Sequence, residues 1–312
     1  MTSYPPIGLR ALFRASHSSL WELAEGAGIL DDLNIRFVSF DPCASSAVAE
    51  SALAEGTVDL VVGNHVTLYG KVARGEPIVC LASPKNVVGA SIVTREPIDD
   101  LSALRDKRII DETPKDPRAG FAHGALNRML YLRRAGIPFD HVDRVERKPG
   151  VGLQQLKIDA MTSGRADAAF ATGSAKAYEE AGLHILELPE LPMINGPTIT
   201  TSYLALHAHD QLGERLVMAQ LRAIALVHTD PASAHESLKK GSRGFVPVTD
   251  QTVARLGRLQ PKPYPAPQAV INAHEICCIQ HPEAEEMNPL AVWDLHYLRE
   301  LDQSGFIDGL YE

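Results

Sequence analysis

The 312-residue sequence is poor in cysteine and has no long apolar run. Its four cysteines, two of them adjacent at Cys277 and Cys278, are too few and too poorly spaced for a disulfide framework, which favours a reducing compartment. No stretch approaches the ~18 consecutive apolar residues that would span a bilayer. The first residues lack the charged start, apolar block and cleavage site of a secretory signal. We therefore expect a cytoplasmic protein without a membrane segment.

An excess of basic charge is also missing. The chain has 30 basic and 39 acidic side chains, a formal net charge of −9, whereas a protein that grips nucleic acid needs a basic surface. Apolar residues make up 45% and charged residues 22%, which is typical of soluble globular proteins and excludes disorder or a fibre. At about 150 residues per domain, the length predicts two domains.

The familiar catalytic and cofactor-binding motifs are absent. The sequence contains no Gly-x-Ser-x-Gly, no His-Glu-x-x-His and no Gly-x-Gly-x-x-Gly, so the usual hydrolase, zinc-protease and dinucleotide signatures do not occur. We expect no cofactor.

An internal repeat at an offset of 108 residues is the most informative feature present. Residues 25–40 align with 133–148, which places Gly28 on Gly136. The same offset carries residues 55–64 onto 163–172. Each copy predicts a β-α-β-α-β unit, the building block of a mostly parallel sheet with flanking helices. Ligands of such sheets bind beyond the carboxyl ends of the strands, so we expect the polar loops there to hold a ligand between two similar lobes.

The repeat, the run IDDLSALRDKRI at 98–109 and the ending NPLAVWDLHYLRELDQSGFID at 288–308 together resemble the type II periplasmic-binding-protein fold. The resemblance is to its nitrate/sulfonate/taurine-binding and thiamine-pyrimidine-synthase-like branch. It implies a two-lobed, hinged α/β fold in which lobe two is an insertion. Lobe one would be 1–94 plus 205–312 and lobe two 95–204, with hinge crossings at 89–95 and 200–208 and a ligand cleft between the lobes.

Candidate ligand contacts in lobe one follow its strands. Ser16, His17 and Ser18 lie where the first strand meets the first helix, whose amides and positive dipole end favour an anion. His17 and His65 are candidate proton donors or acceptors, and Asn64 is a candidate contact at the end of the third strand. The alternative is that the serines cap the helix and the polar strand ends bond their own turns.

Lobe two offers a second set of candidate ligand contacts. Arg118 offers a planar fork for a carboxylate or sulfonate, with a solvated surface loop as the alternative. Thr172, Gly173 and Ser174 end the strand that matches the one before Asn64. Asn195 and Thr198 lead into the predicted return crossing, with a simple Asn-Gly turn as the alternative.

A possible metal site is weighed against packing near the C-terminus. His274, Cys277, Cys278 and His281 share helical faces at spacings of three or four residues, and their side chains are of the types that bind zinc. Buried cysteines are common core residues, so we favour packing and expect no metal.

Two functions remain open. The first is a cytoplasmic enzyme, a lyase such as a decarboxylase acting on a carboxylated ring, with Arg118 orienting the anion and His17 or His65 moving a proton. The second is the solute-binding protein of a nitrate/sulfonate/taurine-type ABC transporter. Both bind a small organic anion, and the missing signal peptide favours the enzyme. The oligomeric state is left open, with a homodimer as one option.

Overall fold

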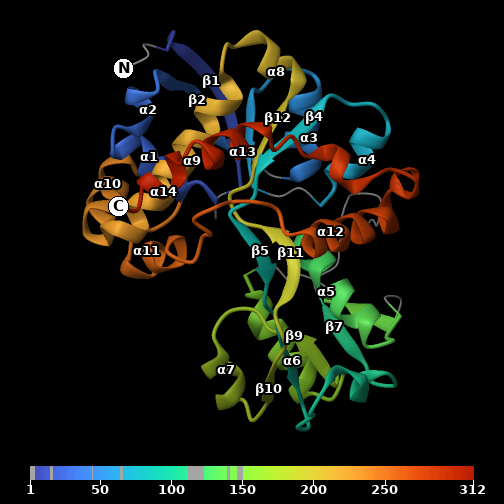
Figure 1. Ribbon diagram of the computed structural model, residues 1–312. Helices are drawn as coiled ribbons and strands as arrows, with labels where there is room; N and C mark the ends of the chain where they lie inside the picture. Colours follow the sequence, from blue (N-terminus) through green and yellow to red (C-terminus); the bar gives the residue numbers. More distant parts are fainter. Residues whose placement is uncertain are drawn as a thin grey trace. The chain divides into compact units, whose positions relative to one another are not determined.

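The computed structural model of the chain describes residues 4–14, 17–43, 45–63, 66–111, 123–138, 141–145 and 150–312, and of the side chains at 123–126 nothing is described. The chain forms two compact units, each with its own sheet (Figure 1). Unit 1 comprises Met1–Asn86 and Met193–Glu312, and unit 2 comprises Val87–Pro192. The second unit is therefore an insertion into the first.

Unit 1 contains a five-stranded mixed sheet in the order β2-β1-β3-β12-β4. The central strand β1 pairs in parallel with β2 and β3, whereas β12 runs antiparallel to both β3 and β4. The strand bounds are Ile7–Phe13 for β1, Ile35–Pro42 for β2, Leu60–Val62 for β3, Ile78–Ala82 for β4 and Ile199–Ser202 for β12.

Unit 2 repeats this topology in the order β8-β7-β9-β6-β10. Here β7 pairs in parallel with β8 and β9, and the antiparallel strand is β6. The bounds are Ser91–Thr94 for β6, Ile109–Asp111 for β7, Val142–Arg144 for β8, Ala168–Phe170 for β9 and His184–Glu187 for β10. The expected two-lobed α/β fold is confirmed, and both of its sheets are mixed.

One ion pair recurs in both copies of the repeat. Just before β3, Asp59 accepts hydrogen bonds from the backbone N–H of Arg10 at 2.8 Å and from its Nε at 3.1 Å. Just before β9, Asp167 accepts the corresponding bonds from Arg108 at 3.1 and 3.0 Å. The aspartates are 108 residues apart, so the offset read from the sequence is a structural equivalence.

The helix ends of the repeat also correspond. After α1 (Ser19–Gly26) and α5 (His123–Arg134) the chain turns at Gly28 and Gly136, with φ of 76° and 71°. Only glycine adopts this left-handed conformation at little cost, which is why an Ala-Gly pair ends each helix.

The chain passes between the units earlier than predicted. The unit boundaries fall at 86/87 and 192/193, and the strands at these crossings, β5 (Lys85–Val88) and β11 (Leu191–Asn195), pair as a two-stranded sheet. The expected crossings at 89–95 and 200–208 instead hold β6 and β12, which belong to the two main sheets. A short extended apolar run looks the same in sequence whether it crosses between units or pairs inside one.

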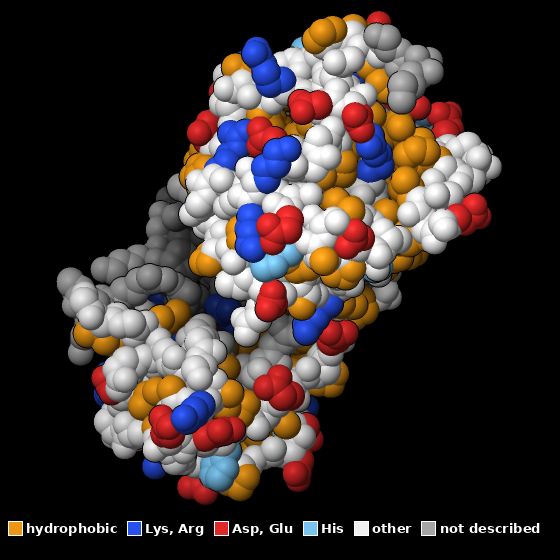
Figure 2. All heavy atoms as spheres, turned by 90° about the vertical axis from the view of Figure 1, so that its left-hand side faces the viewer, with side chains coloured by type: hydrophobic (Ala, Val, Ile, Leu, Met, Phe, Trp, Pro, Cys, Tyr) orange, Lys and Arg blue, Asp and Glu red, His pale blue; other side chains and the backbone are white. Residues whose placement is uncertain are grey.

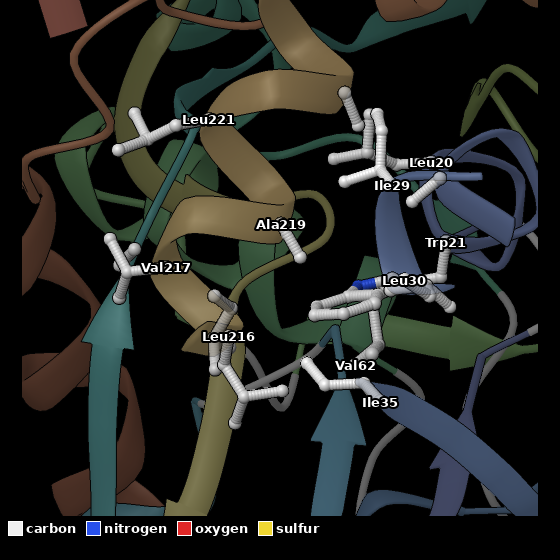
Figure 3. Packing of buried hydrophobic residues seen from close by; sticks show 14 of the residues in the cluster. Leu20, Trp21, Ile29, Leu30, Ile35, Val62, Leu216, Val217, Ala219 and Leu221 are labelled. Atoms are coloured by element: carbon white, nitrogen blue, oxygen red, sulfur yellow. The ribbon is translucent and has the colours of Figure 1, made fainter. Parts of the chain in front are cut away.

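Helices cover the sheet of unit 1 and enclose its apolar core. Trp21 of α1 lies among Leu20, Leu30 and Ile35 opposite Leu216 of α9 (Figure 3). The helices of unit 1 besides α1 are α2 (Ile29–Asp32), α3 (Ser46–Ala54), α4 (Leu68–Ala73), α8 (Tyr203–Ala208), α9 (Leu212–Thr229), α10 (Pro231–Gly241), α11 (Asp250–Leu256), α12 (Pro267–Gln280), α13 (His296–Gln303) and α14 (Phe306–Gly309).

Unit 2 has a smaller core of its own, which includes Val93, Met161 and Tyr178. The helices of unit 2 are α5, α6 (Leu153–Thr162) and α7 (Ala175–Glu180). Within the described ranges of both units, no helix is long and apolar enough to cross a membrane.

Candidate anion-binding site

A small pocket of about 90 Å³ opens in unit 1 near the carboxyl ends of β1 and β3. It is assembled from the loop after β1, the start of β5, the turn before β12, and α11 with the residues that follow it. Its lining consists of His17, Ser19, Lys85, Asn195, Gly196, Pro197, Arg255, Leu256 and Leu259. The residues that meet here are up to 242 positions apart in the chain, from His17 to Leu259.

The position of the His17 ring is set by Gly63, which follows β3. A Cβ placed on Gly63 would lie 2.4 Å from the ring, and the φ of Gly63 is +89°. The Gly63 N–H donates to the Thr198 carbonyl at 3.1 Å, and the His17 N–H donates to the Arg14 carbonyl at 2.7 Å. Glycine is therefore required on steric grounds, because any larger residue would displace the imidazole.

The electrostatics of the pocket favour a negatively charged ligand. Burial, together with the positive charges of Arg255, Arg14 and Lys85, lowers the pKa of His17 from 6.5 to about 4. The imidazole is thus neutral at physiological pH and offers one donor and one acceptor. The described lining contains two cationic side chains, Lys85 and Arg255, and neither aspartate nor glutamate.

The remaining wall is apolar. Pro197, Leu256 and Leu259 form it, and it could cover a carbon skeleton attached to an anionic group.

The structure brings two of the predicted site residues together, since His17 and Asn195 line the same pocket. Asn195 Oδ1 also accepts the N–H of Gly196 at 2.9 Å, as in an ordinary turn. Two other predicted site residues are fully buried, and their hydroxyl groups form hydrogen bonds within the protein. Ser18 donates its hydroxyl to Glu22 Oε2 at 3.1 Å, and Thr198 donates to Ser83 Oγ at 3.5 Å. Neither hydroxyl lines the pocket.

The predicted strand-end residues of unit 2 form a turn held by side chains of that unit. The Thr172 N–H donates to the Tyr178 hydroxyl at 3.2 Å. Gln154 brackets Ser174, accepting its N–H at 3.2 Å and donating to its carbonyl at 2.6 Å. Gly173 has a φ of 81° and leaves room for Gln154. The backbone of this turn is therefore bonded by the side chains of Tyr178 and Gln154. Four predicted site residues, namely Ser16, Asn64, His65 and Arg118, lie outside the described residues.

Arg255 was missed by the sequence analysis. It lies in α11, in the C-terminal third of the chain, on a short helix whose sequence carries no binding motif. Only the packing of α11 beside the turn at 195–197 brings it to the pocket, so no local signal could have identified it.

The cysteine and histidine residues of α12 are engaged in contacts within the protein. His274 Nε2 lies 2.7 Å from the Ala284 carbonyl, and its ring packs edge-on against Tyr69. Cys277 is buried. Across the described part of the chain, no group of three or more His, Cys, Asp or Glu side chains is placed to hold a metal ion.

No protein-family model matches the chain, and no curated protein matches its sequence. Solved structures do match it. The nitrate-binding protein NrtA from Synechocystis PCC 6803 superposes with a TM-score of 0.61 at 13% identity, covering 97% of this chain and 90% of that one. The alkanesulfonate-binding protein SsuA from Xanthomonas axonopodis pv. citri, bound to MOPS, has a TM-score of 0.56 at 15% identity, covering 94% and 100%.

A third match, with a TM-score of 0.60 at 15% identity, is the Candida albicans CA3427 gene product, which is described as having the generic periplasmic-binding-protein fold. It covers 96% of this chain and 95% of that one. These likenesses show the fold of the chain. More specifically, the chain has the type II periplasmic-binding-protein fold that the sequence resemblance implied.

Proposed function

We propose that the protein reversibly binds a small organic anion, a carboxylate or a sulfonate, as a solute-binding protein of the nitrate/sulfonate/taurine type. The observation that carries this proposal is the pocket in unit 1, where the cationic side chains of Lys85 and Arg255 line the same pocket as a neutral His17. Charge-assisted hydrogen bonds from such groups recognise oxyanions well. Two of the similar structures, SsuA and NrtA, are named for binding an alkanesulfonate and nitrate, which are also anions.

The lyase that the sequence analysis favoured has less support than the binding protein. None of the similar structures named above is described as an enzyme. Because its pKa is lowered to about 4, His17 is a neutral imidazole at neutral pH. It lacks the imidazolium proton that a general acid would donate, although it can still form hydrogen bonds. We therefore propose binding without chemistry. The cytoplasmic location stays a prediction.

A thermal-shift screen tests the proposal. We expect MOPS, methanesulfonate, benzoate or benzenesulfonate to raise the melting temperature, because a ligand that binds only the folded state stabilises it. Uncharged analogues such as benzamide should not. Mass spectrometry of each hit after incubation should recover the compound unchanged. A product lighter by carbon dioxide would establish the lyase instead.

A substitution of Arg255 tests whether the ligand binds in the unit 1 pocket. Arg255→Gln should weaken the best hit about 10-fold or more, since a hydrogen bond from a charged group contributes about 1.5–3 kcal/mol. Arg258→Gln, the same change three residues further on and outside the pocket lining, is the matched control. Equal affinities for both variants and the wild type would show that the ligand binds elsewhere.

A further inference from the structure

A buried cluster of three charged side chains lies at the carboxyl edge of the sheet in unit 2. Asp111 is the last residue of β7, Arg128 lies on α5 and Lys157 on α6. Arg128 donates from Nε to Asp111 Oδ2, and Lys157 Nζ lies 3.4 Å from Asp111 Oδ1. Lys157 also donates to the carbonyl of Phe170, the last residue of β9, at 2.7 Å.

The cluster carries more positive than negative charge. Two cations share one carboxylate, and the side chains of Lys157, Asp111 and Arg128 are only 0%, 3% and 15% exposed. Burial lowers the pKa of Lys157 to about 8, with Asp111 opposing and Arg128 adding to this effect. An uncompensated buried charge is costly, and an anion from outside the cluster would balance it.

Arg128 has the geometry to hold such an anion. Asp111 fixes the Nε side of the guanidinium, and the group lies 5.7 Å from the centre of the Phe170 ring, in a cation–π contact. Within the part of the chain that the structure describes, no hydrogen bond involves its two terminal nitrogens. The fork is therefore held in orientation while its terminal N–H groups remain available. A guanidinium held in this way matches the two oxygens of a carboxylate or sulfonate.

The place of the cluster in the repeat agrees with this role. Asp111 and Phe170 end β7 and β9, the counterparts in unit 2 of β1 and β3. In unit 1, the loops after β1 and β3 position His17 in its pocket. Both units thus place cationic groups at the edge where α/β sheets bind ligands.

We infer that Arg128 is a ligand-contacting residue, which binds the oxyanion of a carboxylate or sulfonate through its terminal N–H groups while Asp111 and Phe170 hold the guanidinium. This inference rests on the proposed function and concerns a residue of unit 2.

The test is isothermal titration of the full chain with MOPS, methanesulfonate and benzoate, in Tris chloride because phosphate and sulfonate buffers are themselves oxyanions. Arg128→Gln should weaken binding about 10-fold or more. Arg128→Lys should recover only part of the loss, because lysine keeps the charge and lacks the fork. Arg133→Gln, the same change at an exposed position of α5, should bind like the wild type.

A second measurement needs no variant. Phenylglyoxal modifies accessible arginines, and peptide mass spectrometry can follow Arg128 in the wild-type protein. A bound anion should slow modification at Arg128 and leave Arg133 unaffected. This readout remains valid if Arg128→Gln fails to fold.

The possible failures are distinguishable. If Arg255→Gln weakens binding while a folded Arg128→Gln binds like the wild type and the anion does not protect Arg128, the inference is wrong and the proposed function stands. If the wild type binds none of the three anions, both are wrong.

Discussion

Glu50 is a buried side chain whose protonation differs between the folded protein and the unfolded chain. It lies on α3 and is 1% exposed, and its Oε1 accepts the Thr67 hydroxyl at 2.7 Å. Its Oε2 is buried without a hydrogen-bond partner among the described residues. Burial raises the pKa of Glu50 from 4.5 to about 8, with the Thr67 hydroxyl and Lys71 opposing. The folded protein therefore holds this proton at neutral pH, whereas the unfolded chain releases it.

Stability should reflect this proton. Between about pH 4.5 and pH 8 the folded state binds one more proton than the unfolded state, so Glu50 lowers the free energy of unfolding by up to about 1.4 kcal/mol per pH unit as the pH rises. Glu50→Gln cannot titrate and should lose this slope, becoming more stable than the wild type at neutral pH. Urea unfolding across this range measures it. Glu55→Gln, at the exposed end of the same helix, should keep the slope. An unchanged slope in Glu50→Gln would contradict the assignment.

Among the elements, α1 and α10 approach each other most closely at two glycines. A Cβ on Gly26 would lie 1.9 Å from the Ser237 carbonyl oxygen, and a Cβ on Gly241 would lie 1.9 Å from that of Glu22. The two backbones therefore touch, and no side chain fits between them. This contact fixes α10 against the helix that follows the candidate anion site.

Gly26→Ala should force these two helices apart. Overpacking of this kind costs about 1–3 kcal/mol, so the melting temperature should fall by several degrees. Gly309→Ala in α14 is the matched control, because a Cβ there has no neighbouring atom within 4 Å. The control should be neutral or slightly stabilising, since alanine restricts the unfolded chain. If both variants melted alike, the close helix contact would not exist in solution.

At the scale of the whole molecule, each unit has apolar packing of its own. Unit 1 packs around residues such as Trp21 and Leu216, and unit 2 packs around Met161 and Tyr178. Both tryptophans, Trp21 and Trp293, belong to unit 1. On the face shown in Figure 2, basic and acidic side chains are interspersed, in keeping with the many surface ion pairs. Such exposed pairs contribute little, so the cores dominate.

Because the cores are separate, a defect in one should not spread fully to the other. Met161→Ala removes buried volume from unit 2 and should cost that unit about 2–5 kcal/mol. Circular dichroism, which reports both units, should then show an earlier transition, while tryptophan fluorescence, which reports unit 1, should change little. Leu216→Ala should shift the fluorescence transition instead. Coincident transitions in Met161→Ala would mean that the units unfold as one.

Local patterns in the sequence were enough to predict the repeat and the α/β class. Both depend on residues close together in the chain, such as the glycines that end α1 and α5 and the apolar runs that become strands. The insertion of one unit into the other was implied by the resemblance to the type II periplasmic-binding-protein fold. The loop that carries His17 was predictable because it follows a strand. The same logic selected Ser18, and the predicted return crossing selected Thr198, but sequence position does not show that a side chain turns inward and forms hydrogen bonds within the protein.

Only the tertiary structure decided which charges meet. Arg255 reaches His17 from 238 positions further along the chain, and Asp111, Arg128 and Lys157 come together from one strand and two helices. Glu50 looks like any glutamate of an amphipathic helix until packing excludes water from it. Secondary structure arises from short-range periodicity that a sequence displays directly. Burial and charge proximity depend on long-range packing, and these set the pKa values.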